Sequence, residues 1–174
     1  MRVDAEQFRD VVERHQSMVY SIALRITTDS GIAEEVAQDV FVALFRAMAG
    51  LASEQHIEFW LRRVAVHRSR DAVRRRRLRP EADAEEWQDE RHRPNGEGPG
   101  NAEMELRLEE MLRTLPEAQR IAVVLRYQED LTPDEIAALL EQPVATVKSH
   151  LQRGLALLRR KSDVMLKEFR REHV

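Results

Sequence analysis

The 174-residue sequence contains no cysteine, which excludes disulfide bonds, thiol chemistry and the commonest structural zinc sites. No apolar run approaches the roughly 20 residues that a membrane-spanning helix needs. The first residues, MRVDAEQFRDVVERH, form an acidic amphipathic pattern and not a signal peptide. We therefore expect a cytoplasmic protein with no direct membrane insertion.

Motifs for catalysis are also missing. The six histidines are scattered, and neither a glycine-rich phosphate loop nor a nucleophile motif occurs. Glu34, Glu35 and Asp39 form an acidic cluster that a metal hydrolase could use, but no histidine stands at a ligand spacing beside them. We therefore expect no enzymatic activity, no metal and no cofactor.

Charge, in contrast, is abundant and is distributed in blocks. The formal net charge is −3, yet residues 61–79 carry nine arginines against one acid, and residues 144–171 carry eight lysines and arginines against two acids. Between them, residues 81–110 carry eleven acids against three arginines. A cationic helix end explains one or two arginines. It does not explain nine in so short a segment, so the blocks predict two separate contacts with a polyanion.

Residues 132–161 have the pattern of two short helices joined by a tight turn. Thr132 followed three residues later by Glu135 predicts a capping box, and Pro143 cannot lie inside the first helix. The outward residues of the second helix are of types that bond phosphates and base edges in a major groove: Thr146, Lys148, Ser149, His150, Gln152 and Arg153. Many helical proteins that never touch DNA share such a helix pair, so the pattern alone also allows a solvated cationic helix.

The first half of the chain predicts three further helices. Apolar residues recur every three or four positions across 8–26, 30–48 and 59–77. Residues 27–31 separate the first helix from the second, and a loop is expected at 50–58, before the third.

The segment 80–102 has too few apolar residues to fold, and Trp87 is its one large apolar residue. We therefore expect an all-α fold of two small helical domains, 1–79 and 103–174, joined by a flexible acidic linker at 80–102. The C-terminal domain is expected to carry a helix-turn-helix.

Three stretches give this pattern a family resemblance. They are AEEVAQDVFVALFRAM (33–48), FWLRRVAVHRSRDAVRRRR (59–77) and LPEAQRIAVVLRYQEDLTPDEIAALLEQPVATVKSHLQRGLALLRR (115–160). In order and spacing they resemble the extracytoplasmic-function (ECF) sigma factors, a compact group of the sigma-70 family. The resemblance implies promoter-specific transcription initiation with core RNA polymerase, no catalysis by the chain itself, and control by an anti-sigma factor.

The resemblance also implies roles for residues of the first domain, which would melt and read the minus-ten element. The polymerase-binding residues would be Glu35, Gln38, Asp39 and Phe41, although Phe41 is equally well read as core. The loop Ala52–Phe59 would capture a flipped base of the non-template strand, with His56, Phe59 and Trp60 as candidates, although Trp60 is better explained as core. His67 replaces a common Asn, and the phosphate contacts would come from Arg62, Arg63, Arg68, Arg70, Arg74, Arg75, Arg76 and Arg77.

For the second domain the resemblance implies reading of the minus-thirty-five element in duplex DNA. The face from Thr146 to Arg153 would enter the major groove, and Arg120 and Arg126 would clamp phosphates. Glu141 occupies a turn position where the family commonly has Gly, and His150 stands where Arg is frequent. These departures leave the preferred promoter sequence open.

Two other interpretations compete with this one. A stand-alone helix-turn-helix repressor would account for residues 115–161 but not for the first basic block, and it would bind duplex DNA without polymerase. A regulatory adaptor that binds only protein would leave both basic blocks unexplained.

Overall fold

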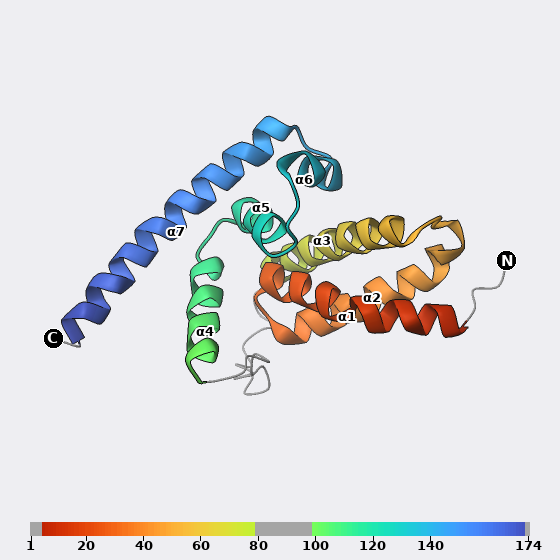
Figure 1. The fold of residues 1–174 in the computed structure, drawn as a ribbon, viewed down its shortest axis with the longest axis horizontal. Helices are drawn as coiled ribbons and strands as arrows, with labels where there is room; N and C mark the ends of the chain where they lie inside the picture. The colour runs from red at the N-terminus through yellow and green to blue at the C-terminus, as the bar shows by residue number, and fades with distance from the viewer. Residues whose placement is uncertain (1–4, 79–98, 173–174) are drawn as a thin grey trace. The chain divides into compact units, whose positions relative to one another are not determined.

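The computed structural model describes residues 5–78 and 99–172, which contain seven α-helices, one 3₁₀ turn and no strand. The chain divides into two compact units, Met1–Arg93 and Pro94–Val174 (Figure 1). The predicted all-α fold is confirmed for the described residues. Most of the predicted acidic linker, including Trp87, lies outside them.

Unit 1 consists of three helices that pack pairwise: α1 (Ala5–Thr27), α2 (Ser30–Ala47) and α3 (Glu54–Leu78), with a 3₁₀ turn at Met48–Gly50 (Figure 1). Their facing sides are fully buried and apolar; the residues are Val19, Ile22 and Ile26 of α1, Val40 and Leu44 of α2, and Leu61, Ala65 and Val66 of α3. Each such Leu or Ile contributes about 1.5–3 kcal/mol. The apolar periodicity of the sequence therefore supplies the core of this unit.

The turn between α1 and α2 is only two residues long. Thr28 adopts φ 57°, and its N–H donates to the Leu24 carbonyl oxygen at 2.8 Å, which ends α1. Asp29 caps α2, because its Oδ1 accepts from the Ile32 N–H at 2.9 Å. A side-chain cap of this kind typically contributes about 1 kcal/mol.

Helix α3 begins at Glu54, earlier than the predicted start near Phe59. Ser53 provides the start signal that the apolar periodicity missed. Its Oγ accepts from the His56 N–H at 3.2 Å, and its carbonyl oxygen accepts from the Ile57 N–H at 2.9 Å. The predicted loop is therefore short, and most of it forms the first turn of α3.

Unit 2 consists of α4 (Pro99–Arg113), α5 (Glu117–Tyr127), α6 (Pro133–Leu140) and α7 (Val144–Glu172). Helix α4 begins inside the segment predicted as linker, with proline at the first helical position, where its missing N–H costs nothing. The buried core includes Leu112, Leu115, Ile121, Leu125, Ile136, Leu139, Val147 and Leu151. Helix α7 packs against each of the other three helices.

Helix α6 begins with the predicted capping box and ends at Glu141 in the turn that leads to α7. Thr132 and Glu135 form the capping box: the Thr132 N–H donates to Glu135 Oε2 at 2.7 Å, and the Glu135 N–H donates to Thr132 Oγ1 at 3.3 Å. Glu141 ends α6 in the left-handed conformation, at φ 55° and ψ 44°, and its N–H donates to the Ala137 carbonyl oxygen. A residue with a Cβ atom is strained there.

Gly154 lies where α7 packs closely against α5. A Cβ atom at this position would lie 2.9 Å from Val123 Cγ2, which is well inside van der Waals contact. The absence of a side chain thus sets the depth at which α7 packs on its unit.

Candidate nucleic-acid interfaces

The first candidate interface is the N-terminal part of α7, which directly follows the α6–α7 turn (Figure 1). Val147 and Leu151 are buried, as their spacing predicted. The predicted reading residues lie around the remaining circumference: Lys148, Gln152 and Arg153 are exposed, and Thr146, Ser149 and His150 are half-buried. We call these six residues the α7 face. In helix-turn-helix proteins this part of the second helix contacts base edges in the major groove.

The two predicted phosphate clamps of unit 2 are less accessible. Arg120 is buried, with 7% of its surface exposed, so it presents little of its guanidinium to an external phosphate. Arg126 is half-buried and supports the α5–α6 turn: its Nη1 donates to the Leu131 carbonyl oxygen at 3.2 Å and lies 3.7 Å from Asp130 Oδ1. A phosphate contact by either residue remains a prediction, and burial weighs against it for Arg120.

The second candidate interface is one side of α3. The buried residues of this helix include Leu61, Ala65 and Ala72. Spacings of three and four residues place a second set together on the side away from these core residues. We call this set the α3 face; its members are His56, Phe59, Trp60, Arg63, His67, Arg70, Arg74 and Arg77.

The α3 face is graded along its length. Its N-terminal end carries His56 and the two large aromatic residues, and the remainder carries the arginines and His67. His56 and Phe59 are exposed, and Trp60 is half-buried. The basic part, from Arg63 to Arg77, is about 21 Å long, which matches the rise of about six nucleotides.

Three arginines of α3 outside this face meet acids of the same unit. Arg62 Nη2 lies 2.7 Å from Glu58 Oε1 on α3 itself. Arg68 and Arg76 reach across to other segments: Arg68 Nη1 lies 3.7 Å from Asp39 Oδ2 on α2, and Arg76 Nη1 lies 3.3 Å from Asp29 Oδ2 in the α1–α2 turn. The arginine-rich run is therefore not one surface, because its side chains leave α3 in more than one direction.

The minus-ten candidates His56 and Phe59, predicted to lie in a loop, lie on the first two turns of α3. A helix begins there because Ser53 caps it. Only Leu51, Ala52 and Ser53 remain between the 3₁₀ turn and α3. Base capture in this region would thus use a short, backbone-constrained segment followed by a helical turn.

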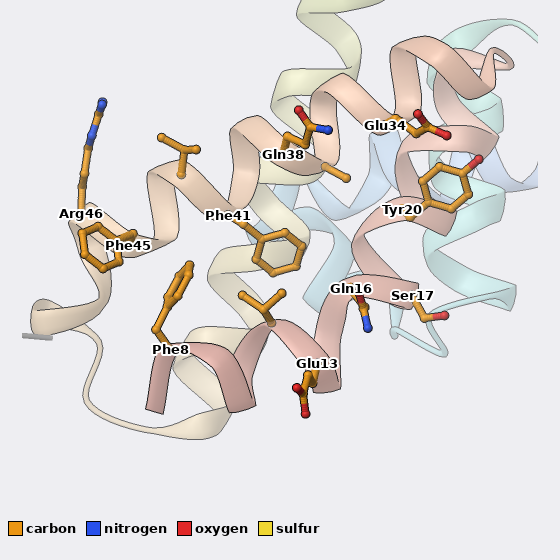
Figure 2. Close-up of a pocket in the computed structure, with 13 residues that line it drawn as sticks. Phe8, Glu13, Gln16, Ser17, Tyr20, Glu34, Gln38, Phe41, Phe45 and Arg46 are labelled. Atoms are coloured by element: carbon orange, nitrogen blue, oxygen red, sulfur yellow. The ribbon is translucent and has the colours of Figure 1, made fainter. Parts of the chain in front are cut away.

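The predicted polymerase-binding residues lie on the exposed side of α2. Glu35, Gln38 and Asp39 are exposed, and Phe41 is half-buried. Phe41 lines an open groove between α1 and α2 and is not part of the closed core (Figure 2). Gln38 lines the same groove, so two of the four residues face it.

Besides Phe41, this groove is lined by apolar side chains that the sequence did not single out as a site. They include Phe8, Val12 and Tyr20 of α1 and Val42 and Phe45 of α2. Phe8 and Phe45 pack edge to face, with ring centroids 5.2 Å apart, yet Val42 and Phe45 each expose about half of their surface, 53% and 51% (Figure 2). Contiguous exposed apolar surface is typical of a protein interaction site. The signal in the sequence was the second apolar stripe of α2, out of phase with its buried one.

Other kinds of site receive no support from the described residues. Across 5–78 and 99–172 no group of His, Asp or Glu is arranged to hold a metal ion. Within the same ranges no helix is both long and apolar enough to cross a membrane.

The sequence matches two protein-family descriptions. Residues 11–79 match Sigma-70 region 2, which covers most of the described part of unit 1, including α2 and α3. Residues 105–158 match Sigma-70, region 4, which includes α5, α6 and the α7 face.

Curated proteins with similar sequences carry corresponding names. RNA polymerase sigma-H factor of Pseudomonas aeruginosa is 27% identical over 96% of this chain and 92% of its own length. ECF RNA polymerase sigma factor SigW of Bacillus subtilis is 27% identical over 90% of this chain and 89% of its own. ECF RNA polymerase sigma-E factor of Escherichia coli is 29% identical over 87% of this chain and 84% of its own.

Two solved structures share the fold. CnrH in complex with the cytosolic domain of CnrY is 24% identical, with a TM-score of 0.68 over 92% of this chain and 90% of that one. The sigma factor RpoE of Bartonella quintana, in complex with the anti-sigma factor NepR, is 18% identical, with a TM-score of 0.75 over 92% of this chain and 99% of that one.

Proposed function

Because this chain belongs to the ECF group of the sigma-70 family, we propose that it binds core RNA polymerase and directs promoter-specific initiation of transcription. The observation that carries the proposal is the presence of two family regions, each with its own cationic helix face. A stand-alone repressor would need only the second of them. The predicted domain 1–79, which falls within unit 1, would act at the minus-ten element. The predicted domain 103–174, which falls within unit 2, would act at the minus-thirty-five element.

The α7 face is the proposed reader of the minus-thirty-five element. Lys148 and Arg153 are exposed cations, and Gln152 between them can donate to and accept from a base edge. His150 and Thr146 are half-buried and would contact the duplex where it lies closest to α7. A buried apolar side that includes Val147 fixes the rotation of the helix, so the face is presented in one orientation.

The α3 face is the proposed reader of the melted minus-ten element. A base removed from the stack is held by aromatic stacking and by hydrogen bonds to its edge. His56, Phe59 and Trp60 supply such groups at one end of the face. The arginines from Arg63 to Arg77 follow in line and would hold the adjoining phosphates.

The exposed side of α2 and the adjoining groove form the proposed polymerase contact. Phe41 and Phe45 offer an apolar centre, and Glu35, Gln38 and Asp39 offer a polar rim. An apolar centre with a polar rim is the usual composition of a protein interface. If polymerase binds the Asp39 carboxylate, that carboxylate would have to leave its ion pair with Arg68.

The remaining parts of the proposal concern regulation and location. Because the RpoE relative was solved with an anti-sigma factor, we propose that an anti-sigma protein also restrains this chain by covering one of the surfaces above. We propose a cytoplasmic location, where the polymerase and the DNA are found. Bond formation would belong to the polymerase, so the chain would act without catalysing a reaction itself.

Run-off transcription tests the proposal directly. Bacterial core polymerase is incubated with a pool of promoter-sized genomic fragments, with and without the chain. We expect specific transcripts only when the chain is present, and their start sites define the promoter sequence. Tight duplex binding without polymerase, together with no transcript, would favour the repressor interpretation and contradict the proposal.

A further inference from the structure

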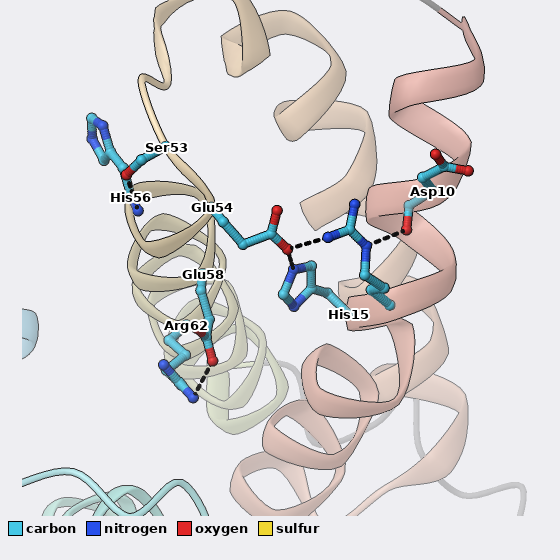
Figure 3. Close-up of polar contacts among 8 residues, drawn as sticks. Asp10, His15, Ser53, Glu54, His56, Glu58 and Arg62 are labelled. Carbon is cyan, nitrogen blue, oxygen red and sulfur yellow. Dashed lines mark hydrogen bonds and ion pairs between the residues drawn. The ribbon is translucent and has the colours of Figure 1, made fainter.

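A polar cluster joins α1 to the first turn of α3 (Figure 3). Arg14 and His15 on α1 both contact one carboxylate oxygen of Glu54, the first residue of α3. Arg14 Nη1 donates to Glu54 Oε1 at 2.7 Å, and His15 Nε2 lies 3.2 Å from the same oxygen. Two neighbouring side chains of one helix thus converge on one acceptor at the start of another.

The cluster is rigid on its α1 side. The His15 side chain is only 11% exposed and lies among buried residues of α1, including Val11 and Val19. An ionised carboxylate only accepts hydrogen bonds, so His15 must carry a proton on Nε2 toward Glu54. The Arg14 guanidinium is held by a second hydrogen bond, since its Nε donates to the Asp10 carbonyl oxygen at 3.3 Å.

The α3 side of the cluster continues into the segment that begins the α3 face. Directly before Glu54, Ser53 Oγ accepts from the His56 N–H at 3.2 Å. The Ala52 N–H donates to His56 Nδ1 at 3.4 Å (Figure 3 shows the ring of His56 projecting outward). A histidine that accepts at Nδ1 carries its proton on Nε2 when neutral, so His56 presents a donor outward.

These contacts matter more for the position of α3 than for the stability of the fold. Arg14 and Glu54 are each about half exposed, at 56% and 49%, and ion pairs of that exposure contribute little to folding. They do fix where the first turn of α3 starts relative to α1. A small misplacement of a recognition group is costly, because its hydrogen bonds depend steeply on distance and angle.

We propose that Arg14 and His15 are positioning residues for minus-ten recognition: by holding Glu54 they set the orientation of residues 52–56 and therefore of His56. The inference rests on the proposed function. Neither Arg14 nor His15 touches DNA in this account. Their effect is on the selectivity for base pairs at the minus-ten element, not on the minus-thirty-five element.

The test uses holoenzyme assembled from the full chain and core polymerase on a promoter found by run-off transcription. Open-complex formation is compared between that promoter and single base-pair substitutions in each element. We expect Glu54→Ala to lower discrimination at the minus-ten element by about three- to tenfold, since misplacement of a positioned group reduces its contribution steeply. Discrimination at the minus-thirty-five element should not change.

Two further variants make the test specific. Asp10→Ala removes one carboxylate from α1 whose side chain makes no contact to α3 in the described residues, and it should leave both discriminations unchanged. Glu54→Gln keeps an acceptor oxygen for both Arg14 and His15, so it should retain most of the minus-ten discrimination that Glu54→Ala loses. Such retention is not expected if only the negative charge of Glu54 matters.

The results that overturn the inference are distinct from failure of the proposed function. Unchanged minus-ten discrimination in Glu54→Ala overturns it. So does an equal loss at both elements that follows the melting temperature of the variant, and so does a Glu54→Gln variant that loses as much minus-ten discrimination as Glu54→Ala. Failure of the proposed function would instead appear in the unsubstituted chain, as an absence of specific transcripts.

Discussion

The helices that carry the two cationic faces share apolar packing but differ in the charged contacts around it. Buried residues such as Leu61 and Ala65 hold α3 on its unit, and two ion pairs add to them toward its C-terminal end: Arg68 to Asp39 and Arg76 to Asp29. In contrast, no ion pair joins Lys148 or Arg153 to another of the described residues of unit 2. There the helix is placed by apolar burial and by the close approach at Gly154.

This difference fits two kinds of DNA recognition. Ion pairs at a half-exposed surface are weak and are screened by salt, so the C-terminal end of α3, where Arg68 and Arg76 form such pairs, can adjust when a strand is melted and captured. Apolar packing is stiff and insensitive to salt, which suits insertion into a groove of fixed shape. The comparison therefore predicts that the C-terminal end of α3 is adjustable and that the α7 face is preset.

The largest expected effect tests base reading by the α7 face. Lys148→Ala or Arg153→Ala should relax selectivity at one base pair of the upstream element by about 1–3 kcal/mol, which is roughly 5- to 150-fold. The measurement is competition binding of holoenzyme among promoters with single substitutions in that element. A loss that is uniform across all sequences would make these residues phosphate contacts and not readers.

Arg159→Ala is the matched control for that prediction. Arg159 is exposed and lies near the same side of α7 as Lys148, but about 16 Å farther from the turn. Arg159→Ala removes the same charge from a part of α7 that would lie too far from the turn to reach the bases. Selectivity should be retained in this variant, and any loss of affinity should be the same for every promoter.

The next effect tests whether the α3 face is the phosphate-binding side of its helix. Arg74→Ala with Arg77→Ala removes two members of the face, whereas Arg75→Ala with Arg76→Ala removes two arginines directed elsewhere. Each lost contact should lower the slope of log affinity against log salt by about 0.7–0.9. We expect a change of about 1.5 for the first pair and less than half of that for the second. Equal changes would show that the run acts as undirected charge.

Sequence periodicity was sufficient for most of the fold. Core positions such as Ile22 and Leu61 could be predicted because burial follows helical spacing, and the Thr132–Glu135 cap could be predicted because a capping box is local. The start of α3 could not be predicted, since the capping residue Ser53 precedes the apolar periodicity of the helix. Local hydrogen bonding therefore determined the boundary that apolar spacing placed too late.

The candidate sites were less accessible to sequence reasoning. The arginines of α3 were grouped together, because adjacency in sequence says nothing about which acids lie across the unit. Asp29 and Asp39 become partners of that helix only after three helices have packed. The convergence of Arg14 and His15 on Glu54 is likewise tertiary, joining positions 39 and 40 residues apart. Contacts at such separation leave no periodic signal.

A smaller effect tests the packing that presets unit 2. Gly154→Ala places a methyl group 2.9 Å from Val123 Cγ2, and overpacking typically costs about 1–3 kcal/mol. The gain in helix propensity is about 1 kcal/mol, so we expect a net loss of about 1 kcal/mol in thermal unfolding. In a Val123→Ala background the same substitution should become stabilising. If the sign does not reverse, the close approach is not what limits the packing.

The smallest effect tests the turn that orients α7. Glu141 holds a left-handed conformation that costs an L-residue about 1–2 kcal/mol and glycine almost nothing. Glycine also gains freedom in the unfolded chain, which offsets about 0.4–1 kcal/mol. Glu141→Gly should therefore stabilise unit 2 by about 0.5–1 kcal/mol, measured by chemical denaturation. Ala138→Gly is the control, since Ala138 is an exposed residue inside α6 and should lose about 1 kcal/mol. Opposite signs from the same replacement, three residues apart, would establish that strain at position 141 is relieved. Destabilisation by both would mean that the contacts of the Glu141 side chain outweigh its backbone strain.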